Sequence, residues 1–257
     1  MGSVAHAQNS QQLAQRVNSL QSLRLQNIFT EQRDSLFTLF DSSITVLMRD
    51  QEFHSNPIDS SLRYFYNGSQ ISNDTNVTLT YAIMSTVLYC NSSDNKLRTY
   101  TCDDLGGGCG HSYRNYLVYK KKRGDIGHYN LDTGRSQSDT EGYSYFGTYD
   151  VKTLKKGRRT LYFLYGFGTF CGSSAYKNIR IFEFNKDTLR ECFECYPNKK
   201  SLELHGNRRH YLHFTVDPKT LDIRYRQYLF DDDSGFYHPD KFEDIVLRFR
   251  NGVYVKE

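Results

Sequence analysis

Residues 245–256 read Ile-Val-Leu-Arg-Phe-Arg-Asn-Gly-Val-Tyr-Val-Lys, two short strand-like runs joined by Asn251-Gly252. Both residues of the joining pair tolerate a positive φ, which most other residues avoid. An Asn-Gly pair between two such runs is the signature of a type I′ turn. The stretch therefore predicts an antiparallel hairpin, Ile245–Arg250 with Val253–Lys256.

The same alternation with a period of two extends back to about residue 79. Short candidate strands are separated by turn sequences such as Asn185-Lys186-Asp187-Thr188 and Asp217-Pro218-Lys219-Thr220. Short strands with few helix-length gaps favour antiparallel pairing. We expect a mainly β fold, either a sandwich, an open barrel or a twisted meander. The other candidate strands are Leu79–Tyr89, Leu97–Thr101, Tyr113–Lys120, Thr160–Phe167, Asn178–Phe184, His210–Val216 and Ile223–Phe230.

Composition agrees with this fold class and narrows the function. The 257 residues include 21 Tyr and 17 Phe but no Trp, and such an aromatic content favours strands over a helical bundle. The net charge of +4, from 33 basic and 29 acidic side chains, is too mild and too mixed to indicate nucleic acid. No apolar run approaches the roughly 18 residues of a spanning helix, so we expect no transmembrane segment.

The N-terminal part of the chain follows a different pattern. Residues 9–50 lack Gly and Pro, and their apolar residues recur at helical spacing. One long helix or two shorter ones fit, with Ser35, Asp41 and Ser42-Ser43 as candidate interruptions. The helical region either packs on the domain or stays exposed for a partner. Residues 51–78 are a polar connector with one short strand near Leu62–Tyr66, and residues 79–257 form the β domain.

Residues 1–8 are predicted to be a residual export signal or tag. Ala5-His6-Ala7 has the small-x-small pattern of a signal-peptidase site, although no charged and apolar regions precede it. A mature chain would then begin near Gln8, and the alternative is a chance match. We expect an exported protein in the periplasm, at the cell surface or outside the cell.

Cysteine usage supports export. An even number of cysteines in an exported chain indicates structural disulfides, with free thiols or metal and redox chemistry as the alternatives. Cys102 and Cys109 bracket a glycine-rich loop, and Cys192 and Cys195 form a C-x-x-C whose flanks suggest a turn between strands. The six candidates are Cys90, Cys102, Cys109, Cys171, Cys192 and Cys195.

One segment resembles a family signature. Residues 92–108 read Ser-Ser-Asp-Asn-Lys-Leu-Arg-Thr-Tyr-Thr-Cys-Asp-Asp-Leu-Gly-Gly-Gly. This resembles the S-x-D-x-K-φ-R-I-Y-S-W-D-T-x-T-G-G signature of a family of exported Bacteroidota proteins. The resemblance covers roughly residues 79–257 and implies compartment and fold, without supplying an activity. Where the family carries Trp this chain has Cys102, so a Cys102–Cys109 disulfide is expected to replace the packing of a large ring.

Catalytic motifs are mostly missing from the sequence. No G-x-S-x-G is present, and His210 and His213 would point to opposite faces of a strand, so they cannot share a metal there. The acidic run Asp231-Asp232-Asp233, with Asp240 nearby, is either a solvated hairpin loop or a Ca²⁺ site. It misses the EF-hand register. The calcium candidates are Asp231, Asp233 and Asp240, and no other cofactor is expected.

These observations favour an exported cell-envelope or secreted binding module without catalytic activity. A glycan or an envelope protein would be its partner. The alternative is a secreted hydrolase acting on a glycan or peptide, which would use two carboxylates at a productive separation or a Ser/His pair. A third possibility is a structural envelope component whose N-terminal helix docks a partner. An exposed aromatic patch, a cleft and an uncovered helix stripe would distinguish the three.

Overall fold

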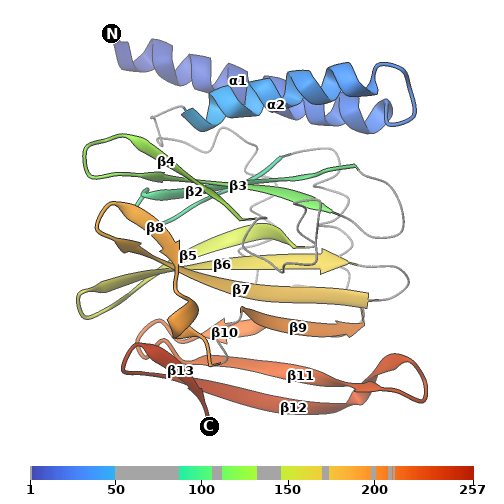
Figure 1. The fold of residues 1–257 in the computed structure, drawn as a ribbon, viewed down its shortest axis with the longest axis vertical. Coiled ribbons are helices and arrows are strands. Elements are labelled where there is room, and N and C mark those ends of the chain that lie inside the picture. The colour runs from blue at the N-terminus through green and yellow to red at the C-terminus, as the bar shows by residue number, and fades with distance from the viewer. Residues whose placement is uncertain are drawn as a thin grey trace.

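The computed structural model describes residues 2–49, 87–105, 112–131, 146–169, 174–197, 201–207, 210 and 212–257. Within these ranges the protein is mainly β, with three antiparallel sheets and an N-terminal helix pair. The helix pair, the N-terminal sheet, the central sheet and the C-terminal sheet follow one another along the long axis (Figure 1). The predicted fold class, a mainly β antiparallel protein with an N-terminal helical region, is therefore confirmed.

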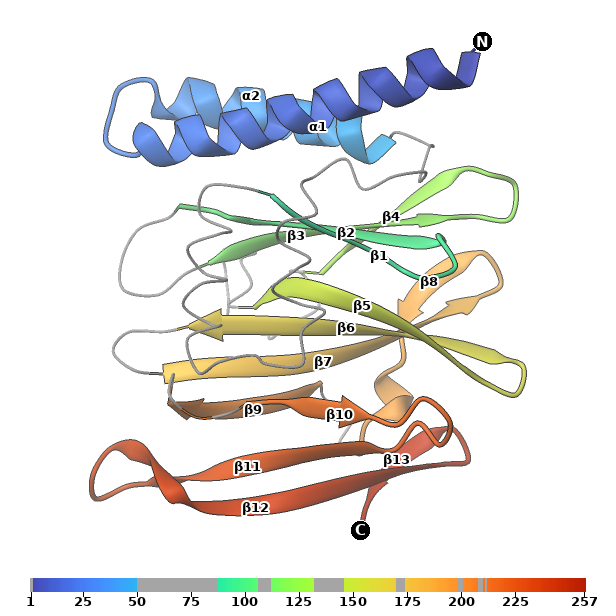
Figure 2. The ribbon, with the colours of Figure 1, turned by 180° about the vertical axis from the view of Figure 1, so that it is seen from behind.

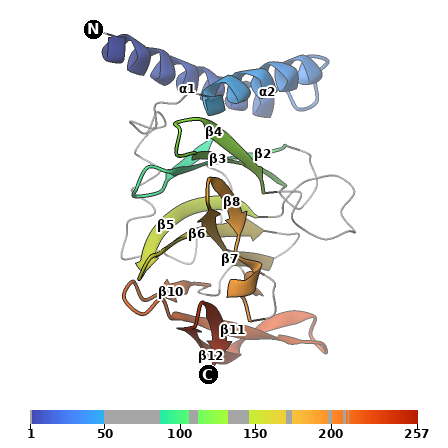
Figure 3. The same ribbon diagram turned by 60° about the vertical axis from the view of Figure 1, so that its left-hand side comes forward.

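The helix pair covers one face of the N-terminal sheet (Figure 3). Its helices are α1 (Gly2–Gln26) and α2 (Arg33–Arg49), and the sheet has the order β1 (Leu88–Asn91), β2 (Leu97–Asp103), β3 (Tyr113–Lys120) and β4 (Ile126–Asn130). Burial of one apolar side of each helix drives this packing. The shared core contains Ala14, Val17, Leu20, Phe40, Ile44, Leu47, Tyr100, Cys102 and Val118. Of the two alternatives for the helical region, the structure shows packing on the domain.

The central sheet lies between the other two sheets. It is built from β5 (Gly147–Lys156), β6 (Arg159–Thr169), β7 (Ser174–Asn185) and β8 (Thr188–Glu191). A further strand, β9 (Leu202–Asn207), also pairs with β7, along residues 174–179, while β8 pairs with residues 182–185. A short 3-10 helix, Phe193–Cys195, connects β8 to β9. Strand β7 is thus a central element with core on both faces.

The C-terminal sheet ends in the predicted hairpin. Its order is β10 (Phe214–Val216), β11 (Ile223–Asp231), β12 (Phe236–Arg250) and β13 (Val253–Lys256). Arg250 pairs with Val253, and Asn251 and Gly252 have φ angles of 52° and 88°. Both positive angles are those of a type I′ turn, so this prediction is confirmed.

The helical region contains two helices, and the break lies elsewhere than expected. The turn falls at residues 27–32, where the Asn27 side-chain amide donates to the Leu23 carbonyl oxygen at 2.8 Å. The predicted interruptions at Ser35, Asp41 and Ser42-Ser43 are wrong, because all of them lie inside α2. The Ser42 and Ser43 hydroxyls both donate to the Leu39 carbonyl oxygen, a pattern that a helix accommodates.

Several predicted strands need correction. Only Phe214–Val216 of the expected His210–Val216 strand is a strand, because His210 closes a turn in which its Nδ1 accepts from the Asn207 backbone N–H. Strand β5 was missed because it is an edge strand with exposed lysines on both faces, Lys152, Lys155 and Lys156, which hide the alternation. Strands β4, β8 and β9 were also missed.

Other sequence predictions lie partly outside the described residues. The connector 51–78, its strand near Leu62–Tyr66 and most of the strand Leu79–Tyr89 belong to this group, and β1 describes only Leu88–Asn91. Helix α1 begins at Gly2, so it includes residues 2–8, which the sequence set apart as an export remnant.

Candidate functional site

Strand β7 carries a lysine at a core position. Ala175, Ile179 and Ile181 lie on the face of β7 that packs into the core shared with the C-terminal sheet. Lys177 shares that face because side chains alternate along a strand. It pairs with Phe167 of β6 and with Leu204 of β9, and it is only 4% exposed. A basic side chain thus occupies a place where an apolar one is the rule.

Among the described residues, the amine of Lys177 contacts aromatic rings and makes no ion pair with a carboxylate. Its Nζ lies 4.4 Å from the ring centroid of Tyr149 and 5.7 Å from that of Phe167. Within the described ranges no hydrogen bond or ion pair reaches this atom. Burial lowers the pKa of Lys177 to about 7, because the ammonium loses its hydration. The neutral amine and the ammonium therefore coexist near neutral pH.

Further polar groups gather beside this lysine. The ring of Tyr165 lies 6.2 Å from that of Tyr149, and Nζ of Lys152 lies 4.9 Å from the Tyr165 ring centroid. The Tyr165 hydroxyl is buried and has no hydrogen-bond partner among the described residues. Burial lowers the pKa of His213, and the charges of Lys152 and Lys177 lower it further, so His213 interacts electrostatically with both lysines. We call Lys177, Lys152, Tyr149, Tyr165 and His213 the Lys177 cluster.

One carboxylate adjoins the cluster without neutralising it. Asp150 pairs with Tyr165 in the register of β5 and β6, and its charge adds to burial in raising the pKa of Tyr165. Its Oδ1 accepts a hydrogen bond of 2.8 Å from the backbone N–H of Val151. No ion pair joins Asp150 to Lys177 or Lys152 in the part of the chain that the structure describes. The cluster therefore combines two basic side chains, a histidine and a hydroxyl donor.

Sequence reasoning missed this cluster. The predicted strand Asn178–Phe184 began one residue after Lys177, and Tyr149 and Lys152 lie on the strand that was missed. One sequence signal could have found it: Lys177 alternates with the apolar residues Ala175 and Ile179, so it takes a position of the strand that should face the core. Chemically, a buried ammonium attracts an anion, and a buried neutral amine can act as a nucleophile or base.

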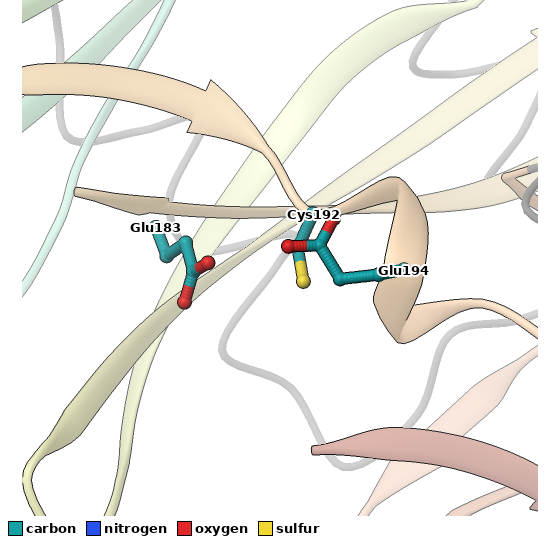
Figure 4. A group of neighbouring side chains, drawn as sticks. All are labelled: Glu183, Cys192 and Glu194. Carbon is teal, nitrogen blue, oxygen red and sulfur yellow. The ribbon is translucent and has the colours of Figure 1, made fainter. Parts of the chain in front are cut away.

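A second group lies near the disulfide. Glu183, Cys192 and Glu194 are the only three acidic, histidine or cysteine residues, among those the structure describes, whose ligand atoms lie within 4.8 Å of one another. Figure 4 shows Glu183 on β7 with Cys192 and Glu194 on the segment that follows β8. Arginines already neutralise both carboxylates: Arg159 and Arg190 lie 2.8 and 2.7 Å from Glu183, and Arg190 lies 2.7 Å from Glu194. Cys192 is bonded to Cys195, so the group has no free thiolate for a metal.

The same contacts bear on hydrolysis. Burial works to raise the pKa of Glu183, but hydrogen bonds and charges from Arg159 and Arg190 outweigh it and hold the pKa below its usual value. A glycoside hydrolase needs one carboxyl group that stays protonated near neutral pH. This pair of glutamates therefore does not favour the hydrolase alternative.

The predicted cysteine pairs have different outcomes. Cys192 and Cys195 form a disulfide in the connection between β8 and β9, as their flanks suggested. Arg159 lies over it, with Nη2 at 3.5 and 3.7 Å from the two sulfur atoms. Cys90 donates to the Tyr149 carbonyl oxygen at 3.0 Å. Cys109 and Cys171 lie outside the described residues.

Cys102 requires a correction. It carries a free thiol, so the expected Cys102–Cys109 disulfide is not formed. The physical reason is the direction of its side chain: alternation along β2 turns Tyr100 and Cys102 toward the helix pair, into the core. Burial there raises the pKa of the Cys102 thiol to about 12, which leaves it protonated and unreactive.

The acidic loop and the histidines complete the predicted residues. Asp231 accepts hydrogen bonds from the Asp233 N–H at 3.3 Å and from the Ser234 hydroxyl at 3.1 Å, as a solvated turn does. Asp231, Asp233 and Asp240 do not form a compact group of ligand atoms, and calcium binding stays an untested prediction. His210 stacks on Tyr228 with ring centroids 4.0 Å apart, whereas the pKa of His213 is lowered by burial and by the charges of Lys152 and Lys177.

Comparison with known proteins adds no relative. No family model matches the chain, and the searches found no similar curated protein and no similar solved structure. The resemblance to the Bacteroidota family therefore stays a prediction. None of the described helices is long and apolar enough to cross a membrane.

Proposed function

We propose that the protein is an exported binding module without catalytic activity, and that it binds a partner protein through the arm formed by residues 226–244. The arm consists of the end of β11, the following turn and the start of β12. Strand β10 pairs only with residues 223–225 of β11, and β13 pairs only with residues 247–250 of β12. Among the described residues no strand is therefore hydrogen-bonded along either edge of the arm, although β9 packs near β11 and β12. Figure 2 shows its turn at the end of the molecule away from β13.

The exposed aromatic surface of the arm carries the proposal. Phe236 is 60% exposed, Phe230 is 52% exposed, and Leu229 and Phe242 are also exposed. The Phe230 and Tyr237 rings pack at 5.1 Å, and the Arg226 guanidinium lies 3.7 Å from the Phe242 ring centroid. Exposed large apolar side chains are typical of an interaction site, and aromatic residues with arginine supply most binding energy at such sites. The register pairs Phe230 with Tyr237 and Phe236 with Asp231, so the exposed rings lie on both faces of the arm and a partner would contact both faces.

Charge indicates the kind of partner. Residues 226–244 contain six acidic and two basic side chains, a net charge of −4 in a chain whose net charge is +4. A complementary surface would therefore offer an apolar pocket with a basic rim, and association would weaken as salt increases.

The other candidate functions have less support. The apolar sides of α1 and α2 already pack on the N-terminal sheet. This gives less support to a structural component that docks a partner through its N-terminal helix. The Glu183–Glu194 pair is neutralised by arginine, which disfavours a hydrolase. The Cys192–Cys195 disulfide supports export, because such bonds persist in oxidising compartments.

Site-specific photo-crosslinking in the producing cell tests this function. A benzophenone amino acid would replace Phe236 in one variant and Phe29 in the other. Phe29, on the turn between the helices, is 98% exposed and controls for exposure alone. We expect a discrete protein adduct from position 236 and none from position 29. The adduct should weaken when Phe230→Ser is added. Equal labelling from both positions, or none from position 236, would overturn the proposal.

A further inference from the structure

We propose that the Lys177 cluster is a binding site for a small organic carboxylate with an apolar body. This site lies in the core between the central and C-terminal sheets and does not depend on the function of the arm. The proposal rests on which polar groups the fold brings together there and on which of them lack partners.

Every polar member of the cluster offers positive charge or a hydrogen-bond donor. Lys177 has no hydrogen bond or ion pair among the described residues, and the Tyr165 hydroxyl is buried without a partner, with Tyr165 only 3% exposed. Nζ of Lys152 lies 4.9 Å from the Tyr165 ring centroid, and His213 interacts electrostatically with both lysines. A carboxylate supplies two acceptor oxygens for these donors and a counter-charge for Lys177, against some repulsion from Asp150 beside Tyr165, and charge-assisted hydrogen bonds are the stronger kind.

The surroundings also fit the rest of such a ligand. The rings of Tyr149 and Phe167 lie against Lys177 and against each other, with centroids 5.9 Å apart. They offer an apolar wall of the kind that lines small-molecule sites. Lys152 is exposed and His213 is partly exposed, so the cluster extends from the buried lysine toward the surface.

A purely structural role explains less. Contact with two rings can hold an ammonium in a core, and this would account for Lys177 alone. It does not account for the Tyr165 hydroxyl, because a phenylalanine of the same shape would fill that place without burying an unpartnered donor. A ligand that accepts hydrogen bonds from both groups accounts for the two together.

Thermal unfolding at pH 7 tests the proposal with benzoate and benzamide as probes. These compounds have nearly the same shape, but only benzoate carries a negative charge. We expect benzoate to raise the melting temperature in a saturable manner and benzamide to leave it unchanged. The benzoate shift should disappear in Lys177→Met, and the Kd should rise about tenfold in Tyr165→Phe. An exposed lysine on β5 provides the control, and Lys155→Met should keep the full shift.

Two results would overturn the site. One is a benzoate-induced rise in melting temperature that persists in Lys177→Met. The other is a wild-type melting temperature that does not rise with benzoate. NMR titration of the Lys177 side chain in wild type provides a readout that does not depend on any variant folding. Benzoate should raise the pKa of Lys177 and benzamide should not, and an unchanged pKa under saturating benzoate would likewise contradict the proposal.

Discussion

Strand β7 buries two basic side chains and treats them in opposite ways. Arg180, on the face toward the N-terminal sheet, donates to both carboxylate oxygens of Glu191 at 3.1 and 2.6 Å and to the Leu131 carbonyl oxygen at 2.7 Å. Lys177, on the opposite face, has only aromatic rings within the described residues. Burial alone would lower the pKa of Arg180, but Glu191 more than offsets this and the pKa stays above its usual value.

The fold gives Arg180 a counter-ion and hydrogen-bond acceptors, whereas it gives Lys177 neither among the described residues. Glu191 also accepts a hydrogen bond of 3.1 Å from Tyr196, so the partner of Arg180 is itself held in place. No comparable arrangement surrounds Lys177 among the described residues. A buried ion pair with all its hydrogen bonds made is a structural element, whereas a perturbed buried amine marks a candidate site.

The largest expected effect comes from removing the partner of Arg180. Glu191→Gln keeps the shape of the side chain but leaves a buried guanidinium without a counter-ion. We expect a loss of about 3–5 kcal/mol in the free energy of unfolding, measured by urea denaturation. Glu194→Gln is the matched control, since its exposed ion pair with Arg190 should contribute at most about 1 kcal/mol. Equal losses of unfolding free energy in the two variants would contradict the idea that the buried ion pair matters more than the exposed one.

Lys177→Met should have the opposite sign and should depend on pH. The pKa of Lys177 is about 7 in the folded protein and lies near 10.4 in an unfolded chain, so the unfolded chain binds more protons between these values. Wild-type stability therefore rises with pH across this window. We expect Lys177→Met to be more stable than wild type at pH 7, with the advantage shrinking by about 3 kcal/mol by pH 10.

The measurement is the difference in unfolding free energy between wild type and Lys177→Met at both pH values. Lys152→Met, which removes an exposed lysine of the same cluster, should show a much smaller change. A stability difference between the two proteins that does not change with pH would mean that Lys177 stays protonated in the folded protein.

The sequence predicted the architecture better than it predicted the charge on β7. The hairpin around Asn251-Gly252 and strands such as Tyr113–Lys120 follow from local rules, because turn residues and alternation act within a few positions. Edge strand β5 escaped because its lysines resemble loop residues. Both contrasted sites depend on pairings between distant segments, which local patterns do not specify.

The cysteines show the same limit. Cys192 and Cys195 could be paired from sequence because they are separated by three positions and bracket a turn. The Cys102–Cys109 expectation failed because the direction of the Cys102 side chain depends on the helices that pack on β2. Closeness in sequence predicted a disulfide correctly for Cys192 and Cys195, but not for Cys102, whose side chain packs in the core instead.

Removing the disulfide gives the smallest expected effect. It tests whether the Cys192–Cys195 bond helps to hold the ion pair between Arg180 and Glu191. Cys192 directly follows Glu191, and its backbone N–H donates to Ile181 at 2.8 Å. Tyr196, just past Cys195, accepts from the Ile181 N–H at 2.6 Å. The bond therefore fixes a short loop that holds both Glu191 and Tyr196 against β7. Since short loops give small entropic gains, Cys192→Ala/Cys195→Ala should lose about 2 kcal/mol in urea denaturation.

A reductant separates this bond from any other. Wild type should lose at least a similar amount when unfolded with a phosphine reductant present, and the loss that remains in the double variant measures any contribution of the other cysteines. Combining the double variant with Glu191→Gln should then give less than the sum of the separate losses, because the loop acts through the same ion pair. Strict additivity would show that the disulfide stabilises the chain independently of Arg180, and that the ion pair on β7 needs no covalent support.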